Sequence, residues 1–307
     1  MFFRKKYILA KIESTYGTDP VAVGGDAILT KNLQINPQQG NRVNRDLDRS
    51  TLGNDSEIAT SRYTTISFDV ELAGSGTAGT APGFGSLLRA CGLNETIVAS
   101  TSVTYAPVSE SFESVTIDFR IDGELHKLTG ARGTVSFSLT RDEIPMMSFE
   151  FTGLYNTPTA PALVTPDFSA FEVPLPVTDA NTPTYTVDGY NAKAESFSLD
   201  LANEVVYRNV VNDESVMITD RAPAGSIAFE QEVIGTKNFH TITEDGALIA
   251  VDIVHGTVAG NIVQVTGNQV QLSQPQLSDS DGISLMTCNT LWTPTSSGDD
   301  ELSIVFT

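Results

Sequence analysis

The sequence predicts a mainly β protein in which two similar β domains follow one another, and three observations carry this prediction. Apolar and polar residues alternate over several stretches, which is typical of antiparallel strands with one buried face. Thr, Ser, Val and Gly are abundant and helical patterns are few, which favours strands and turns. A similar order of patterns occurs on both sides of a proline-rich stretch between residues 156 and 184.

The strands of the first half are indicated by strict alternation. In YTTISFDVEL (63–72) every second residue is apolar from Ile66 onward, so one face of the strand is expected to pack in a core. The Asp122-Gly123 pair predicts a tight hairpin turn, because both residue types tolerate a positive φ. The same alternation predicts further strands at 114–121, 134–139 and 147–155.

Two short helices and one linker interrupt the strand patterns. Apolar residues at helical spacing predict a helix within 82–92, and a second candidate lies at 236–246. The segment 157–184 contains six prolines, which cannot lie in a central strand or a helix interior. We therefore expect an extended linker, ordered in places by its apolar residues Leu163, Phe168, Phe171 and Val173.

The two sides of the linker show the same succession of patterns. A strand, a long polar segment and a second strand open each half, with Leu33 and Ile35 corresponding to Phe197 and Leu199. Sequence identity between the halves is low, so the order of patterns carries the argument. We predict a first domain at 1–156, the linker at 157–184, and a diverged second copy at 185–307.

The charge balance restricts the possible partners. The chain has 18 Lys and Arg against 38 Asp and Glu, a formal net charge of -20. Such a surface repels phosphate and disfavours ordinary nucleic-acid binding, although high charge also serves simple solubility. Cys91 and Cys288 are expected to be reduced and buried. No stretch approaches the roughly 20 apolar residues of a membrane span, and we expect synthesis in a cytoplasm.

A glycine-rich segment raises the question of nucleotide binding. Gly74, Gly76 and Gly79 have the spacing G-x-G-x-x-G after an expected strand. A dinucleotide site also needs a buried parallel strand, a helix that starts inside the motif, and an acidic residue after the next strand. Here the preceding strand alternates and Pro82 separates the glycines from the helix. We interpret the segment as a small-residue connection between a strand and a helix.

Other patterns of catalysis or metal binding are weak. No G-x-S-x-G sequence occurs, and His126, His240 and His255 are scattered. The acidic segment 277–288 lacks the terminal acids of a calcium loop. The sequence therefore predicts no catalytic, cofactor or metal residue, and we expect a protein that is not an enzyme. A β-fold hydrolase would need a carboxylate pair that the spacing does not reveal.

One long polar segment, 38–63, concentrates cations in an acidic chain. It is either a solvated loop or a docking arm for an acidic surface, of which another copy of this chain is the nearest example. Its candidate contact residues are Arg42, Arg45, Asp46, Asp48, Arg49 and Arg62.

Four segments carry a resemblance to a known family. They read YILAKIESTYGTDP (7–20), VELAGSGTAGTAPGFGSLLRACG (70–92), VTYAPVSESFESVTIDFRIDGELHKLTGARGTVSFSL (103–139) and FEFTGLY (149–155). Together they resemble the tail tube (major tail) proteins of long-tailed, Mu-like siphophages. The resemblance covers most of residues 1–155 and is looser beyond Pro158.

The resemblance implies a fold and a role. The fold would be a β-sandwich or small barrel with a short flanking helix and a long loop. Together with the repeated order of patterns, this predicts two tandem tail-tube-like domains, each with such a helix and loop. Such domains form rings that stack into a hollow tube for DNA passage, with no catalytic residues and no cofactor. The long loop and the N-terminal segment of the family often make contacts between rings. By position these contacts would involve the residues of segment 38–63 named above, together with Arg4, Lys5 and Lys6.

This role implies particular partners and an alternative. Two domains per chain would give a ring of three chains with pseudo-sixfold symmetry, or the second half would decorate the outside of the tube. Other tail proteins at the tube ends and a tape-measure protein in the lumen are expected partners, and DNA would pass without binding. The protein would be made in the bacterial host cytoplasm and reside in the virion tail. The alternative is a tail-tip or surface-binding β-sandwich adhesin that does not polymerise.

Overall fold

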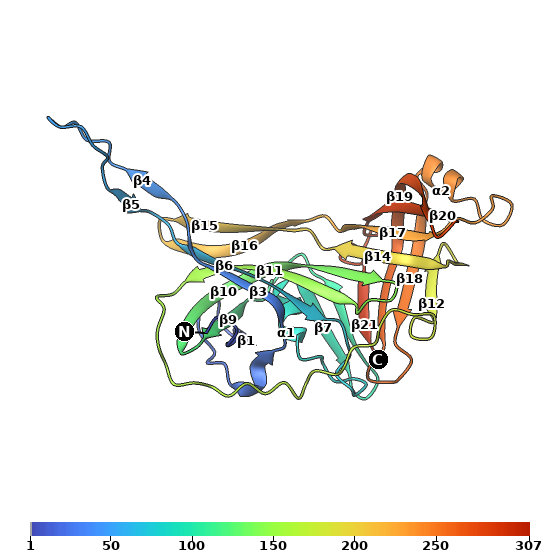
Figure 1. The fold of residues 1–307 in the computed structure, drawn as a ribbon, viewed down its shortest axis with the longest axis horizontal. Coiled ribbons are helices and arrows are strands. Elements are labelled where there is room, and N and C mark those ends of the chain that lie inside the picture. The colour runs from blue at the N-terminus through green and yellow to red at the C-terminus, as the bar shows by residue number, and fades with distance from the viewer. Residues whose placement is uncertain (1) are drawn as a thin grey trace.

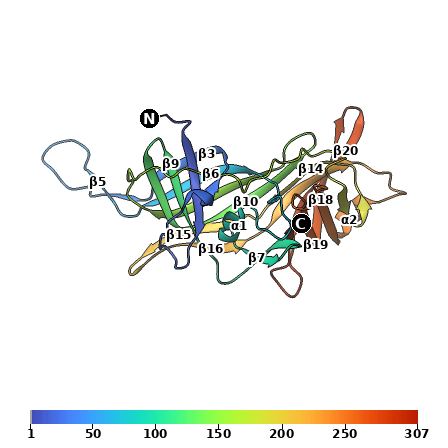
Figure 2. The ribbon, with the colours of Figure 1, turned by 90° about the horizontal axis from the view of Figure 1, so that it is seen from below.

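The computed structural model describes residues 2–307, and this part of the chain is mainly β, as predicted. Residues 2–307 contain two α-helices, α1 (Gly85–Ala90) and α2 (Phe239–Asp245), one within each expected helical segment. A 3-10 turn, η1, covers Gly24–Asp26. Figures 1 and 2 show the two halves of the chain side by side along the longest axis.

The strands of the first half precede the linker. They are β1 (Lys6–Ile12), β2 (Ala27–Ile28), β3 (Lys31–Gln39), β4 (Arg42–Asn44), β5 (Glu57–Ala59), β6 (Tyr63–Glu71), β7 (Leu93–Val98), β8 (Ser102–Pro107), β9 (Val115–Ile121), β10 (Glu124–Thr140) and β11 (Met146–Tyr155).

The strands of the second half follow the linker. They are β12 (Thr184–Val187), β13 (Tyr190–Asn191), β14 (Ala194–Asp200), β15 (Asn203–Val210), β16 (Asp213–Arg221), β17 (Ala224–Glu230), β18 (Leu248–His255), β19 (Val263–Ser280), β20 (Ile283–Trp292) and β21 (Ser303–Phe306).

The pairing order of the strands is the same in both halves. Antiparallel pairs give the order β3, β6, β11, β10, β9, β1 in the first half. They give β14, β17, β20, β19, β18, β12 in the second. A hairpin, β4–β5 or β15–β16, interrupts the chain between the first two strands of each order. A short helix follows β6 in one half and β17 in the other.

Strand β10 joins the two halves. Its first part pairs with β9, and its last five residues pair on the same edge with β14, from Ser136 opposite Asp200 to Thr140 opposite Ser196. The strands β3, β6, β11, β10, β14, β17, β20 and β19 are therefore consecutive in one sheet, which we call the eight-strand sheet. Strand β21 adds a second connection by pairing with both β8 and β19.

One hydrophobic core runs through both halves. The alternation predicted for 63–72 is confirmed, since Ile66, Phe68 and Val70 are buried on one face of β6. The Phe68 and Phe149 rings stack with centroids 5.6 Å apart. The core continues without a break from these residues to Phe229 and other residues of the second half. The predicted turn is also present, with positive φ angles at both residues of the Asp122-Gly123 pair.

The linker runs along the surface in extended form. Leu125 and Thr159 form an isolated bridge, and the Phe171 ring packs against Phe84 with centroids 6.5 Å apart. The expectation that Leu163 and Val173 order the linker is wrong, because their side chains are 73% and 79% exposed. Other linker residues make the contacts instead, since Val164 and Phe168 pack against the small cluster of Leu9, Ala22 and Ala27.

The glycine-rich segment joins the two halves by close backbone contact. The Gly74 amide donates to Asn261 Oδ1 at 2.8 Å, and the Gly76 amide donates to the Gly260 carbonyl at 2.9 Å. A Cβ atom on Gly74 would lie 2.0 Å from the Gly260 carbonyl oxygen. The absence of side chains is what lets these two turns meet.

Candidate subunit interface

Two long strand edges lack a partner at the ends of the eight-strand sheet. Within residues 2–307, β3 pairs with β6 alone, and β19 beyond Ser273 pairs with β20 alone. Residues 273–279 are exposed on both faces, and β3 is exposed except around Leu33 and Ile35. An unpaired edge presents a row of amide and carbonyl groups that another strand can bind.

The β10–β14 junction shows how such an edge is filled. Phe137 of β10 lies between two cross-strand neighbours, Met147 of β11 and Leu199 of β14, and is buried. Leu277 of β19 likewise lies opposite a methionine, Met286 of β20. On its other side no strand of the described chain follows, and Leu277 is 56% exposed. The last part of β19 therefore resembles β10 without its β14.

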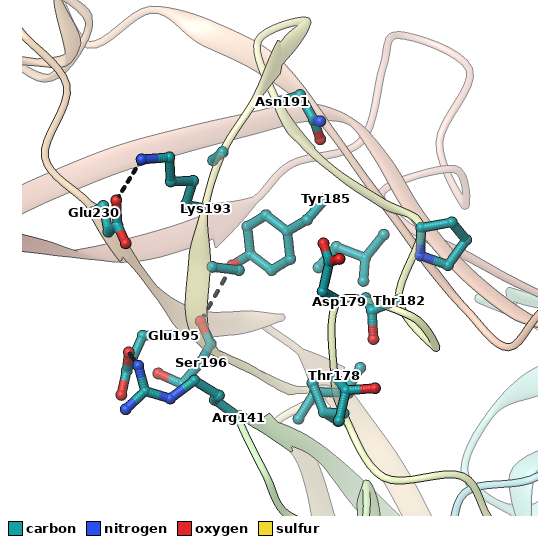
Figure 3. Close-up of a pocket in the computed structure, with 16 residues that line it drawn as sticks. Arg141, Thr178, Asp179, Thr182, Tyr185, Asn191, Lys193, Glu195, Ser196 and Glu230 are labelled. Atoms are coloured by element: carbon teal, nitrogen blue, oxygen red, sulfur yellow. Dashed lines mark hydrogen bonds and ion pairs between the residues drawn. The ribbon is translucent and has the colours of Figure 1, made fainter.

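The edges of β3 and β14 correspond to each other, and a side chain of another strand donates a hydrogen bond to a backbone carbonyl of each. Lys6 Nζ of β1 donates to the Leu33 carbonyl of β3 at 2.6 Å. Tyr185 Oη of β12 donates to the Ser196 carbonyl of β14 at 3.2 Å, as Figure 3 shows. Ser196 is also paired with Thr140 of β10, so such a donor is compatible with a neighbouring strand.

A pocket of about 330 Å³ lies at the junction of the halves, where β10, the linker, β12 and β14 meet (Figure 3). Arg141 forms an ion pair with Glu195 at 2.9 Å, and Lys193 forms one with Glu230 at 2.8 Å. Burial raises the pKa of Tyr185, so its hydroxyl is protonated and serves as a donor. Four charged side chains of the pocket lining are thus paired with one another, and the pocket forms a seam between the halves.

The face of the eight-strand sheet opposite the core is hydroxylic and acidic. Asp69 Oδ1 accepts a hydrogen bond from Ser148 Oγ at 2.7 Å, and its Oδ2 accepts one from Asn32 Nδ2 at 2.7 Å. Arg132 of β10, paired with Thr152, also faces this side and donates to the Val216 carbonyl of β15–β16. Hydroxyl and carboxylate side chains occupy most of the other positions on this side of β6, β11, β10 and β14. These are Thr65, Ser67, Asp69 and Glu71 of β6, Ser148, Glu150 and Thr152 of β11, Thr134, Ser136 and Ser138 of β10, and Ser196, Ser198 and Asp200 of β14.

The hairpin β4–β5 carries most of the contact residues predicted from the sequence. Figure 1 shows it projecting from the body of the molecule. Arg49 forms an ion pair with Asp55, whose Oδ2 also accepts from the Leu47 amide at 2.7 Å. Arg62, at the base of the hairpin, lies over the Tyr155 ring at 5.9 Å. Five of the predicted contact residues are exposed on this arm, namely Arg42, Arg45, Asp46, Asp48 and Arg49.

The predicted N-terminal residues lie apart from this hairpin. Arg4 and Lys5 are exposed, and the Lys5 ammonium lies 5.2 Å from the Phe2 ring centroid. Lys6 lies over the Phe3 ring at 3.9 Å while it binds the β3 edge. The structure therefore brings Lys6 to the β3 edge and the arginines of 42–49 to the projecting arm.

The second hairpin, β15–β16, folds back over the first half (Figure 1). The Val216 amide donates to Tyr16 Oη at 2.6 Å, and the Val216 carbonyl accepts from Arg132 Nη1 at 2.8 Å. At its base Arg221 Nε donates to the buried Glu301 at 2.5 Å. The sequence reasoning identified neither these anchors nor the strand edges. The length of the alternating pattern in 263–280 is the one signal that could have indicated a strand extending beyond its partners.

Residues 2–307 contain no group of three His, Cys, Asp or Glu side chains placed to hold a metal ion. Cys91 and Cys288 are buried free thiols, as predicted. In the same part of the chain, no helix has the length and apolar character that a membrane crossing requires.

Comparisons with known proteins are consistent with an assembling β protein. No curated protein matches the chain. A family model described as phage tail tube protein matches residues 4–291, which span both halves and the linker. The chain therefore belongs to the phage tail tube protein family.

Proposed function

We propose that three chains close into a ring in which β3 of each chain pairs with the last part of β19 of the next. The rings then stack into the hollow tube of the phage tail. The observation that carries this proposal is the β10–β14 junction, because β19 and β3 present the corresponding edges unfilled. In this reading residues 1–156 and 185–307 are two copies of one ring-forming domain, connected by the linker 157–184.

The register of the internal junction supplies a register for the contact between chains. If Met147 and Met286 are equivalent, Phe137 corresponds to Leu277 and Leu199 to Ile35. Residues 276–280 of one chain would then pair with 32–36 of the next, and Leu277 would lie opposite Ile35. Both side chains point to the core face, so their contact would extend the apolar core around the ring.

The same geometry supports three chains per ring. The eight-strand sheet of each chain consists of two sets of four strands. Rings of six such sets are typical of the tail tube family, so three chains would supply one ring. The alternative, with the second half outside the tube, is disfavoured because β14, β17, β20 and β19 continue the sheet of the first half.

We further propose that the part of the hydroxylic and acidic face that β15–β16 leaves uncovered lines the channel. DNA carries about one negative charge per 1.7 Å of its axis, so carboxylates on the wall repel it and lysines or arginines would retain it. The tape-measure protein would occupy this lumen before DNA passes, and other tail proteins would bind the tube ends. The protein would be made in the host cytoplasm, reside in the virion tail and have no catalytic role.

Negative-stain electron microscopy of the purified protein, with top views classified by symmetry, tests this function. We expect rings or tubes of three chains, and we expect Leu277→Lys to leave folded monomers, since the lysine would lie in the apolar contact with Ile35. The matched control is Leu163→Lys, which changes an exposed linker residue. Six chains per ring, or rings of normal abundance with Leu277→Lys, would contradict the proposal. Discrete particles at every concentration would favour the adhesin.

A further inference from the structure

We propose that the hairpin β4–β5 of one chain lies across β19 and β20 of the neighbouring chain in the same ring. This inference rests on the proposed ring. It assigns the arm to contacts within a ring, whereas the resemblance had suggested contacts between rings. The exposed surface of β19 and β20 would therefore be covered by a second copy of this chain, which binds through its hairpin β4–β5.

The arrangement inside the chain provides the model for this contact. Hairpin β15–β16 has one face built from two cross-strand pairs, Val205 with Ile218 and Tyr207 with Val216. Val216 and Ile218 are buried there, and the Tyr207 ring lies 4.8 Å from the Tyr63 ring. The hairpin contacts β10 and β11 of the other half.

The β4–β5 hairpin has an equivalent face with nothing beneath it. Val43 and Ile58 form an apolar cross-strand pair, as Tyr207 and Val216 do. In residues 2–307 no other strand pairs with β4 or β5, and the two side chains are 53% and 55% exposed. An apolar pair on a projecting arm loses hydrophobic free energy until a partner covers it.

The surface that would receive this pair lies on β20. Glu150 and Thr152 of β11 line a groove beneath Val205–Asn209 of the second hairpin. Counted from the equivalent residues Met147 and Met286, Thr152 corresponds to Leu291. Leu291 is 44% exposed. The position that is polar beneath β15–β16 is thus apolar where the Val43–Ile58 pair would lie.

Charge at the two ends of the hairpin favours the same arrangement. Near its turn, Asn209 and Glu214 of β15–β16 line a groove with Arg62, at the base of β4–β5. The turn of β4–β5 would correspondingly reach the base of β15–β16 in the next chain. There Glu204 and Asp220 lie opposite each other and are both exposed, a like-charge pair that is unfavourable alone. Arg45, exposed at the turn of the arm, supplies the opposite charge.

A disulfide between chains tests the contact. In the full-length double variant Val43→Cys/Leu291→Cys, mild oxidation of assembled protein should give covalent products that stop at three chains. Native Cys91 and Cys288 are buried, so the wild type should remain monomeric on a denaturing gel. The matched control is Val43→Cys/Leu163→Cys, which pairs the arm with an exposed linker position and should crosslink at least tenfold less.

The outcomes separate this inference from the ring proposal. Rings seen by microscopy without crosslinked trimers would overturn the hairpin contact and leave the ring intact. Crosslinked products longer than three chains would place the arm on the next ring, which also overturns the inference. The absence of any ring from the uncrosslinked protein would overturn both proposals together.

Discussion

At the scale of single residues, His255 shows how the linker is fixed to the second half. Its Nε2–H donates to the Leu175 carbonyl at 3.1 Å, and its Nδ1 accepts from Thr182 Oγ1 at 3.0 Å. The Leu175 carbonyl can only accept, so Nε2 carries the proton, and the Thr182 hydroxyl can donate to the unprotonated Nδ1. Both bonds are therefore satisfied by the neutral ring. The ring is buried, and this burial lowers the pKa of His255 below its ordinary value.

This lowered pKa predicts a loss of stability in mild acid. Below about pH 6.5 the unfolded chain binds a proton at this histidine, while the folded chain resists protonation until its own lower pKa is reached. The free energy of unfolding should therefore fall as the pH decreases through this window, and His255 should contribute no slope above it. Urea denaturation between pH 5 and 8 measures the effect.

The control for this prediction is a substitution away from the histidine. His255→Gln should flatten the slope below pH 6.5, whereas Leu163→Gln, at an exposed linker position, should keep the slope of the wild type. An unchanged slope with His255→Gln would show that other groups determine the acid sensitivity.

At the scale of elements, the contact between the glycine-rich segment and residues 260–261 joins the halves. Gly74→Ala should destabilise the protein by about 2 kcal/mol, because the new Cβ would push the two backbones apart and strain the hydrogen bonds of Gly74 and Gly76. Thermal denaturation measures the change. Gly235→Ala is the control, since a Cβ there meets no atom within 4 Å. Equal melting temperatures for the two variants would contradict the packing argument.

The sequence predicted elements better than it predicted their neighbours. The alternation in 63–72 identified β6 and its buried face, since period-two burial follows directly from strand geometry. The pairing of β10 with β14 could not be foreseen, because alternation defines two faces of a strand and says nothing about which strand lies beside it. Leu163 and Val173 were assigned to contacts that do not form, since an apolar residue in a linker is buried only where another layer passes over it.

The same limit applies to the candidate interface. The composition of 38–63 identified the arm, because cations are rare elsewhere in the chain. The strand edges of β3 and β19 are apparent only once all other pairings are known. In the sequence, Leu277 stands out only as part of a calcium-like segment. In the structure it has a strand on one side, β20, whereas its counterpart Phe137 has a strand on both sides, β11 and β14.

At the scale of the whole molecule, the net charge of -20 opposes assembly. Ring formation brings like-charged chains together, and salt screens that repulsion. Assembly should therefore become faster and more complete as salt rises from about 0.01 M to about 1 M, where the Debye length falls from about 30 Å to about 3 Å. Light scattering at fixed protein concentration measures the rate and the extent of assembly at each salt concentration. Assembly that weakens with salt would instead show that local pairs, such as those of the arginine-bearing arm, dominate the contact.

The return of β21 to the first half has a consequence for the timing of synthesis. Val103 of β8 pairs with Phe306 of β21, so the sheet that contains β7 and β8 is completed by residues translated long after it. A chain still held on the ribosome therefore retains an open edge at β8, and its long-range pairing makes this step slow. Neighbouring nascent chains on one messenger RNA can join through that edge, so a chaperone that covers β8 before release would protect the protein from this association.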